Sequence, residues 1–205
     1  MAQQARKAGL LIFQNRWVER LTRTHIAVPL VIFYGIGLCI AAYVLSQGTL
    51  NLASVAVILT SGMLVFSLFE YLVHRHLFHI QSALSSIRRL RYLFHGVHHE
   101  TPRDPHRLAM PPIVSLAISA SLLSLFHWVA GYSGLVFGGG FLMGYATYLM
   151  VHYAVHRMKP PKNQLRILWR HHSIHHYKDD GVAFGVSSPL WDYVFGTMPP
   201  RRDPR

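Results

Sequence analysis

Four long apolar stretches dominate the pattern of hydrophobic and polar positions along the 205-residue chain. They cover residues 26–46, 50–73, 110–130 and 135–155, and Glu70 is the one Asp, Glu, Lys or Arg that they contain. A helix needs about 20 mostly apolar residues to cross the hydrocarbon core of a bilayer. The pattern therefore predicts an all-α integral membrane protein with four transmembrane helices.

The segments that join these stretches differ in length and in charge. Residues 47–51 and 131–134 are short, contain glycine and carry no lysine or arginine. All 20 lysines and arginines lie in residues 1–25, 74–109 and 156–205. Because cytoplasmic segments of membrane proteins are enriched in these residues, we expect both termini and the central segment on the cytoplasmic side. The membrane would be a bacterial inner membrane or the endoplasmic reticulum.

Two smaller segments flank a predicted membrane domain of residues 26–198. Apolar residues recur at helical spacing in the N-terminal segment, residues 1–25: Leu10, Phe13, Trp17 and Leu21. This spacing predicts an amphipathic helix at the membrane interface, although an ordinary packed helix would show the same pattern. Residues 199–205 are predicted to form a basic tail.

Composition narrows the classes of protein that remain. Charged residues make up 14% of the chain, whereas about 25% is usual for a soluble domain. The net charge is +12, and the basic segments alternate with apolar runs. This arrangement is typical of contact with anionic lipid and argues against nucleic-acid binding. The single cysteine, Cys39, excludes an internal disulfide and a cysteine-rich zinc site.

Histidine is the residue type that indicates chemistry. Ten of the 15 histidines fall into four clusters at the predicted cytoplasmic boundary: His74 and His79; His95, His98 and His99; His152 and His156; His172, His175 and His176. Residues three or four positions apart share a helix face, so three clusters can each present neighbouring imidazoles. His74 and His79 lie about 140° apart on an ideal helix, so they need a local kink or serve two different centres.

Neutral imidazole is the commonest metal ligand in proteins. Ten imidazoles exceed what one ion accepts, so the pattern predicts two metal ions with about five ligands each, and it fits iron, zinc, copper or nickel equally. Carboxylates are too few to bridge the ions, and five of them could instead orient imidazoles or be exposed surface charges: Glu70, Glu100, Asp104, Asp179 and Asp180. The remaining histidines are expected to be structural or to support the ligands: His25, His76, His106, His127 and His171.

These clusters and their flanks resemble the fatty acid hydroxylase/sterol desaturase superfamily, and most closely its fatty acid 2-hydroxylase branch. The matching text lies between about residues 66 and 197: Glu70-Tyr71, HRHLFH (74–79), FHGVHH (94–99), Asp104, Arg107-Leu108, Pro111-Pro112, Gly144-Tyr145, Tyr148, HYAVH (152–156) and HHSIHHYKDDGVAFGVSSPLWDYVFGT (171–197). The resemblance implies a four-helix membrane anchor with a cytosolic helical cap that houses a di-metal site. It also implies that the ten clustered histidines hold two iron ions, or zinc in the isolated protein.

The activity implied is O2-dependent hydroxylation of a fatty acyl chain, at C2, in a free fatty acid or a sphingolipid-type lipid. Substrate contacts are expected from Arg107, Tyr145 and Tyr148, and Leu149 occupies a position where the family commonly has aspartate. The chain has no room for the cytochrome b5 domain that some relatives carry, so we expect a separate donor of the cytochrome b5 or ferredoxin type.

Other functions remain open at this point. A desaturase or a sterol or carotenoid oxygenase would use the same histidine clusters. A zinc-dependent membrane hydrolase would need neither O2 nor a reductant. A metal transport protein would place its ligands near the middle of the bilayer, whereas these clusters lie at the ends of the apolar stretches.

Overall fold

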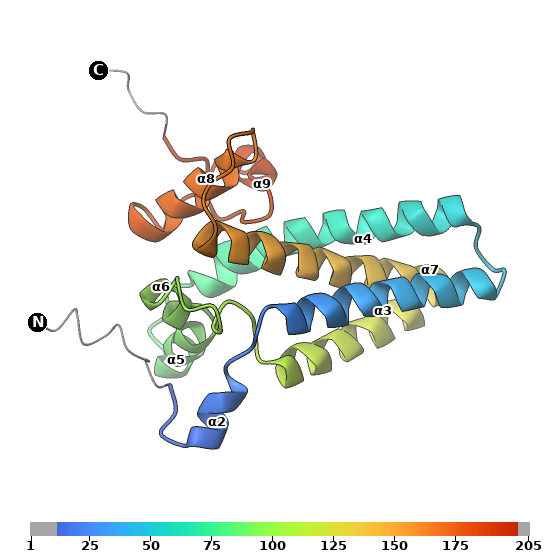
Figure 1. The fold of residues 1–205 in the computed structure, drawn as a ribbon, viewed down its shortest axis with the longest axis horizontal. Coiled ribbons are helices and arrows are strands. Elements are labelled where there is room, and N and C mark those ends of the chain that lie inside the picture. The colour runs from blue at the N-terminus through green and yellow to red at the C-terminus, as the bar shows by residue number, and fades with distance from the viewer. Residues whose placement is uncertain (1–11, 201–205) are drawn as a thin grey trace, which may run out of the picture.

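The computed structural model describes residues 12–200, which form helices and loops without a β-strand in that range. The long helices are α3 (Ala27–Ser46), α4 (Leu52–Leu72) and α7 (Pro112–Arg157). The short elements are α2 (Arg16–Leu21), η1 (Val73–Phe78), α5 (Ser85–Arg91), η2 (Tyr92–Gly96), α6 (Val97–Glu100), α8 (Arg166–Tyr177) and α9 (Leu190–Val194). Figure 1 shows the long helices side by side, with the short elements gathered at one end of the bundle. The all-α prediction is confirmed.

Three helices are long and apolar enough to cross a membrane by length and composition, namely α3, α4 with η1, and α7. The sequence predicted four, because it treated residues 110–130 and 135–155 as separate helices. In the structure both lie within α7, and non-helical backbone at Ala130 and at Gly131, where φ is +57°, divides α7 into two helical arms. The Phe126 ring lies 5.2 Å from that of Phe137 and 5.8 Å from that of Phe141, so the two arms of α7 fold back on each other.

Glycine allows α4 and α7 to approach each other closely. A Cβ added at Gly62 would lie 2.2 Å from the carbonyl oxygen of Phe137, and one added at Gly140 would lie 2.1 Å from the carbonyl oxygen of Leu59. Small residues at such contacts let helix backbones pack together in membranes, where water does not drive helices together. The position of α4 against α7 therefore depends on these two glycines.

Replacing Gly62 by alanine is expected to lower the melting temperature of the detergent-solubilised protein by several degrees. The added methyl group has no space and must push the helices apart, and overpacking of this kind costs about 1–3 kcal/mol. Gly35→Ala is the control, because a Cβ at Gly35 has no neighbour within 4 Å. Equal melting temperatures for the two variants would contradict the close packing.

The N-terminal segment combines exposed apolar residues with a buried carboxylate. Trp17 and Leu21 on α2 are 75% and 56% exposed, whereas Glu19 is buried, forms an ion pair with Arg107 and accepts a hydrogen bond from the backbone N–H of Phe13 at 3.1 Å. Burial raises the pKa of Glu19, but hydrogen bonds and the Arg107 charge outweigh it and lower the pKa overall. The interfacial role of α2 stays a prediction, and Leu10 lies outside the described residues, as does most of the predicted basic tail.

Candidate metal centre

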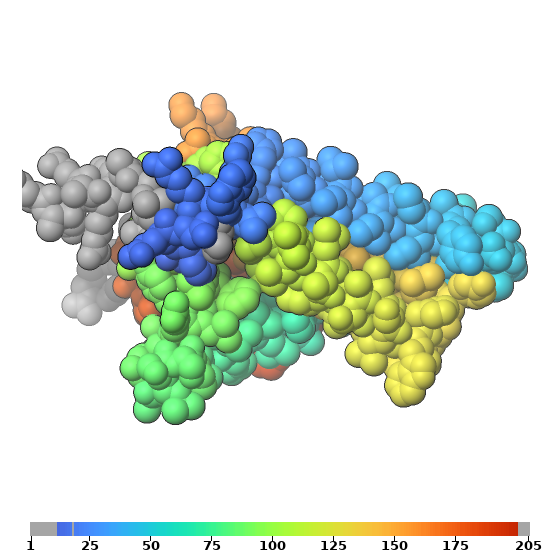
Figure 2. All heavy atoms as spheres, turned by 90° about the horizontal axis from the view of Figure 1, so that it is seen from below, coloured from blue at the N-terminus to red at the C-terminus, as the bar shows by residue number. Residues whose placement is uncertain are grey.

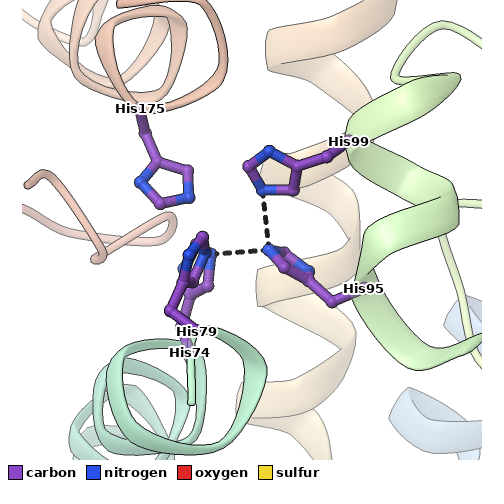
Figure 3. Close-up of side chains that lie close together, drawn as sticks. All are labelled: His74, His79, His95, His99 and His175. Atoms are coloured by element: carbon purple, nitrogen blue, oxygen red, sulfur yellow. Dashed lines mark hydrogen bonds between the residues drawn. The ribbon is translucent and has the colours of Figure 1, made fainter. Parts of the chain in front are cut away.

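All ten clustered histidines come together in two groups of five. The first group contains His74, His79, His95, His99 and His175, and the second contains His98, His152, His156, His172 and His176. Within each group, one nitrogen of every ring lies within 4.8 Å of the corresponding atom of the others. Figure 3 shows the rings of the first group pointing toward a common centre from separate parts of the chain. The sequence predicted two groups of about five but left their membership open.

Helix geometry explains how the groups divide. Consecutive helical residues are rotated by about 100°, so His98 and His99 on α6 face different groups. On α8, His175 likewise belongs to the first group, while His172 and His176 share the other face. Because α6 and α8 each contribute to both groups, the two groups lie side by side.

A π-helix supplies the local distortion that the spacing of His74 and His79 required. The segment from Val73 to Phe78 forms the π-helix η1 instead of continuing α4. A π-helix has i→i+5 hydrogen bonds; His79 directly follows η1, and the ring centroids of His74 and His79 lie 5.2 Å apart. A second π-helix, η2, leads directly into α6 and carries His95.

The nitrogen atoms of the first group are arranged as lone-pair donors around one point. Nε2 of His95 lies 3.0 Å from Nε2 of His74 and 2.8 Å from Nε2 of His99. His175 donates its Nδ1–H to the carbonyl oxygen of Val182 at 2.9 Å. A neutral ring that donates from Nδ1 carries a lone pair on Nε2, and the Nε2 atom of His175 is buried without a hydrogen-bond partner among the described residues.

The second group converges in the same way. Nε2 of His98 lies 3.0 Å from Nε2 of His176 and 2.9 Å from Nε2 of His152, and Nε2 of His172 lies 2.8 Å from Nε2 of His156. Ligand atoms that share one ion through bonds of about 2.1 Å lie about 3.0–3.4 Å apart. Both groups therefore fit a transition-metal ion, which would satisfy lone pairs that otherwise face one another.

Burial keeps these imidazoles neutral. It lowers the pKa of His79 to about 4 and that of His99 to about 3, with a further contribution from the nearby His175. Burial also lowers the pKa of His95, His98 and His172 well below the ordinary value. Because a histidine binds metal in its deprotonated form, these rings are available as ligands at neutral pH.

The carboxylates chosen from the sequence have other partners. Glu70 accepts a hydrogen bond from the backbone N–H of Val186 at 2.6 Å, Asp104 accepts one from that of His106 at 3.0 Å, and Asp179 accepts one from that of Gly181 at 2.9 Å. None of these hydrogen bonds joins Glu70, Asp104 or Asp179 to a clustered histidine, so their support of the ligand imidazoles stays a prediction. Asp180 lies 3.8 Å from Nδ1 of His79, and Glu100 accepts a hydrogen bond from the Tyr92 hydroxyl.

Sequence reasoning missed a buried carboxylate near the groups. Asp192 is fully buried and accepts a hydrogen bond from Nε2 of His171 at 2.9 Å. Burial raises its pKa, but hydrogen bonds from His171, Thr197 and Gly185 outweigh that effect and lower it overall. In the sequence, the position of Asp192 between Trp191 and Tyr193, in an otherwise apolar segment, could have indicated a buried carboxylate.

An apolar cavity of about 770 Å³ reaches the histidines of both groups. Its wall includes His74 and His95 of the first group, His98 and His152 of the second, and apolar side chains of α4, η2 and α7. Near the cavity, α2, α5 and the start of α7 lie together at the end of the bundle (Figure 2). The size and lining are typical of a site for a hydrophobic ligand.

The three predicted substrate residues all line this cavity, as does the buried Leu149. The ring of Tyr148 stacks on that of His152, with centroids 5.3 Å apart, and on that of Tyr145, with centroids 6.2 Å apart. Arg107 is buried and pairs with Glu19. Its role toward substrate stays a prediction.

Comparison with known proteins agrees with this geometry. The model of the fatty acid hydroxylase family matches residues 59–197. The chain is 35% identical over 196 residues to the dihydroceramide fatty acyl 2-hydroxylase FAH2 of Arabidopsis thaliana, covering 93% of this chain and 81% of that protein. It is 40% identical over 146 residues to the human (Homo sapiens) fatty acid 2-hydroxylase, covering 69% of this chain and 39% of that protein.

A solved structure of full-length scs7p, in which only the hydroxylase domain is visible, has the same fold. It aligns with a TM-score of 0.84 at 32% identity, covering 94% of this chain and 73% of that one. The resemblance seen in the histidine motifs is thereby confirmed. The chain belongs to the fatty acid hydroxylase family.

Proposed function

We propose that this protein is a membrane-bound fatty acyl 2-hydroxylase that uses two iron ions, O2 and external electrons. The observation that carries the proposal is the pair of five-histidine groups at the wall of a 770 Å³ apolar cavity. The relatives named as fatty acid or dihydroceramide 2-hydroxylases support the choice of C2. The substrate would be a free fatty acid or a sphingolipid-type lipid.

The protein's contribution is to hold ligands and substrate in place. When bound, the iron ions would supply the O2 chemistry needed to oxidise an unactivated C–H bond. The ten histidines would bind them, five to each ion, with zinc as a possible substitute in isolated protein. The apolar wall of the cavity would hold the acyl chain and exclude water. Tyr148, stacked on His152, would lie between the histidines and the lipid.

The arrangement in the membrane forms part of the proposal. We infer that α3, α4 with η1, and the two arms of α7 make four crossings, with the short elements forming a cytosolic cap. The segments rich in lysine and arginine support this orientation, and exposed apolar residues on the long helices, such as Val31 and Val57, would face lipid. Hydroxylation with O2 consumes two electrons and two protons, so an electron donor must supply them, and we propose one of the cytochrome b5 or ferredoxin type.

Labelling with 18O2 tests the activity directly. Lipids from cells with and without the protein, grown under 18O2, would be compared by mass spectrometry. We expect 2-hydroxy acyl chains that contain one 18O atom in the expressing cells, with 16O2 cultures as the control. A new double bond without 18O would instead indicate a desaturase, and a product formed without O2 would indicate a hydrolase. Either result would overturn the proposal.

A further inference from the structure

The loop between α8 and α9 contacts the first histidine group through its backbone. The carbonyl oxygen of Val182 accepts the Nδ1–H of His175 at 2.9 Å, and the carbonyl oxygen of Phe184 accepts the Nδ1–H of His74. Both rings therefore turn Nε2, with its lone pair, toward the first group. A carbonyl partner of this kind fixes the tautomer and the orientation of a metal-binding histidine.

This loop has no regular secondary structure to hold it. Instead, four consecutive backbone N–H groups donate to two buried carboxylates. Those of Phe184 and Gly185 donate to Asp192 at 2.8 and 2.7 Å, and those of Val186 and Ser187 donate to Glu70 at 2.6 and 3.2 Å. Asp192 approaches from α9 and Glu70 from α4, so the loop is held between two distant parts of the chain.

Further contacts strengthen this attachment. The Ser187 hydroxyl donates to Glu70, and the Thr197 hydroxyl donates to Asp192 at 2.7 Å. A Cβ at Gly185 would lie 2.2 Å from the Ser188 carbonyl oxygen, so the loop passes where only glycine fits. Burying two carboxylates is costly unless their hydrogen bonds are satisfied, and here backbone donors satisfy both.

We propose that Asp192 and Glu70 are positioning residues for the first histidine group. By fixing the backbone of residues 184–187, they hold the Val182 and Phe184 carbonyls where they orient His175 and His74. This inference rests on the proposed metal-binding function. It assigns to Glu70 an indirect role in orienting imidazoles, through the loop.

The test is metal binding by the purified full chain. Metal-free protein would be titrated with Co²⁺ in competition with a chelator, while the absorption spectrum of Co²⁺ is recorded. We expect Asp192→Asn and Glu70→Gln to weaken one of the two Co²⁺ equivalents about 10- to 100-fold and to change its spectrum. In Asp192→Asn an amide N–H₂ group would face one backbone donor, because Phe184 and Gly185 donate to different oxygens of Asp192. In Glu70→Gln a neutral amide oxygen would replace the carboxylate oxygen that accepts from both Val186 and Ser187, and it is a weaker acceptor. In both variants the loop would lose part of its attachment.

Asp179→Asn is the matched control, because Asp179 follows α8 closely but is exposed and bonds to Gly181 rather than to residues 184–187. Ser187→Ala removes one hydroxyl contact to Glu70 and keeps the test usable if the carboxylate variants fail to fold. Two ions bound with wild-type affinity and spectrum in folded variants would overturn the positioning role. Wild-type protein that binds no metal would instead overturn the proposed function.

Discussion

Replacing His175 by alanine is expected to abolish hydroxylation and to leave at most one metal ion bound per chain. The His175 ring lies in the first group, within 5.2 Å of the rings of His74, His79 and His99 between centroids. Removing it deletes one ligand and leaves the Val182 carbonyl without its donor. His98→Ala should have the same effect through the second group. Product would be measured by mass spectrometry and metal content by elemental analysis.

His76→Ala is the control for both variants. His76 lies in η1 between His74 and His79, which both belong to the first group. Its own side chain is exposed and belongs to neither group. We expect wild-type activity and metal content for this variant, and membrane insertion equal to wild type for all three. Full turnover by His175→Ala or His98→Ala would show that the ten histidines do not form the reactive site.

Replacing Ser119 by phenylalanine (Ser119→Phe) is expected to reduce the hydroxylation of long acyl chains about tenfold or more, because misplaced substrates react slowly. Ser119 is buried on the first arm of α7 and lines the cavity. The larger ring would fill space that the acyl chain needs, while the histidine groups stay intact. Activity with long and short acyl chains would be compared at equal metal content.

The matched control is Ser121→Phe, two positions further along the same arm, where the side chain is exposed. An added ring there would point away from the cavity, and activity should be unchanged. If Ser119→Phe retains wild-type turnover with long chains, the 770 Å³ cavity is not the acyl site. A loss that is larger for long than for short chains would assign this part of the cavity to the acyl tail.

The histidine pattern predicted that imidazoles gather into groups, because helix geometry is local. Pairs four apart, such as His152 and His156, must share a face wherever their helix lies. Which pairs meet could not be predicted, since it depends on how α6, α7 and α8 pack. The spacing of His74 and His79 indicated that a local kink would bring them to one site, but it did not predict that the kink would be a π-helix.

The hydrogen-bond partners of the carboxylates could not be predicted from the sequence, for a different physical reason. Glu70 and Asp192 act on backbone N–H groups, and every residue except proline has such a group. The acceptors for His74 and His175 are carbonyl oxygens, which also leave no signature in the sequence. The two arms of α7 were expected as separate helices, and helical geometry is interrupted between them at Ala130 and Gly131.

The tight reversal at Ala130 and Gly131 also limits which part of the protein is accessible from the side of the membrane opposite the cap. It lies close to the end of α3, since the rings of Tyr43 and Tyr132 are 6.1 Å apart, and the turn into α4 lies at the same end (Figure 1). In the proposed orientation, these two turns are all that the described chain offers to proteases, antibodies or glycosylation on that side. In that orientation, signals that act on the described residues would arrive mainly from the cytoplasm or through the lipid.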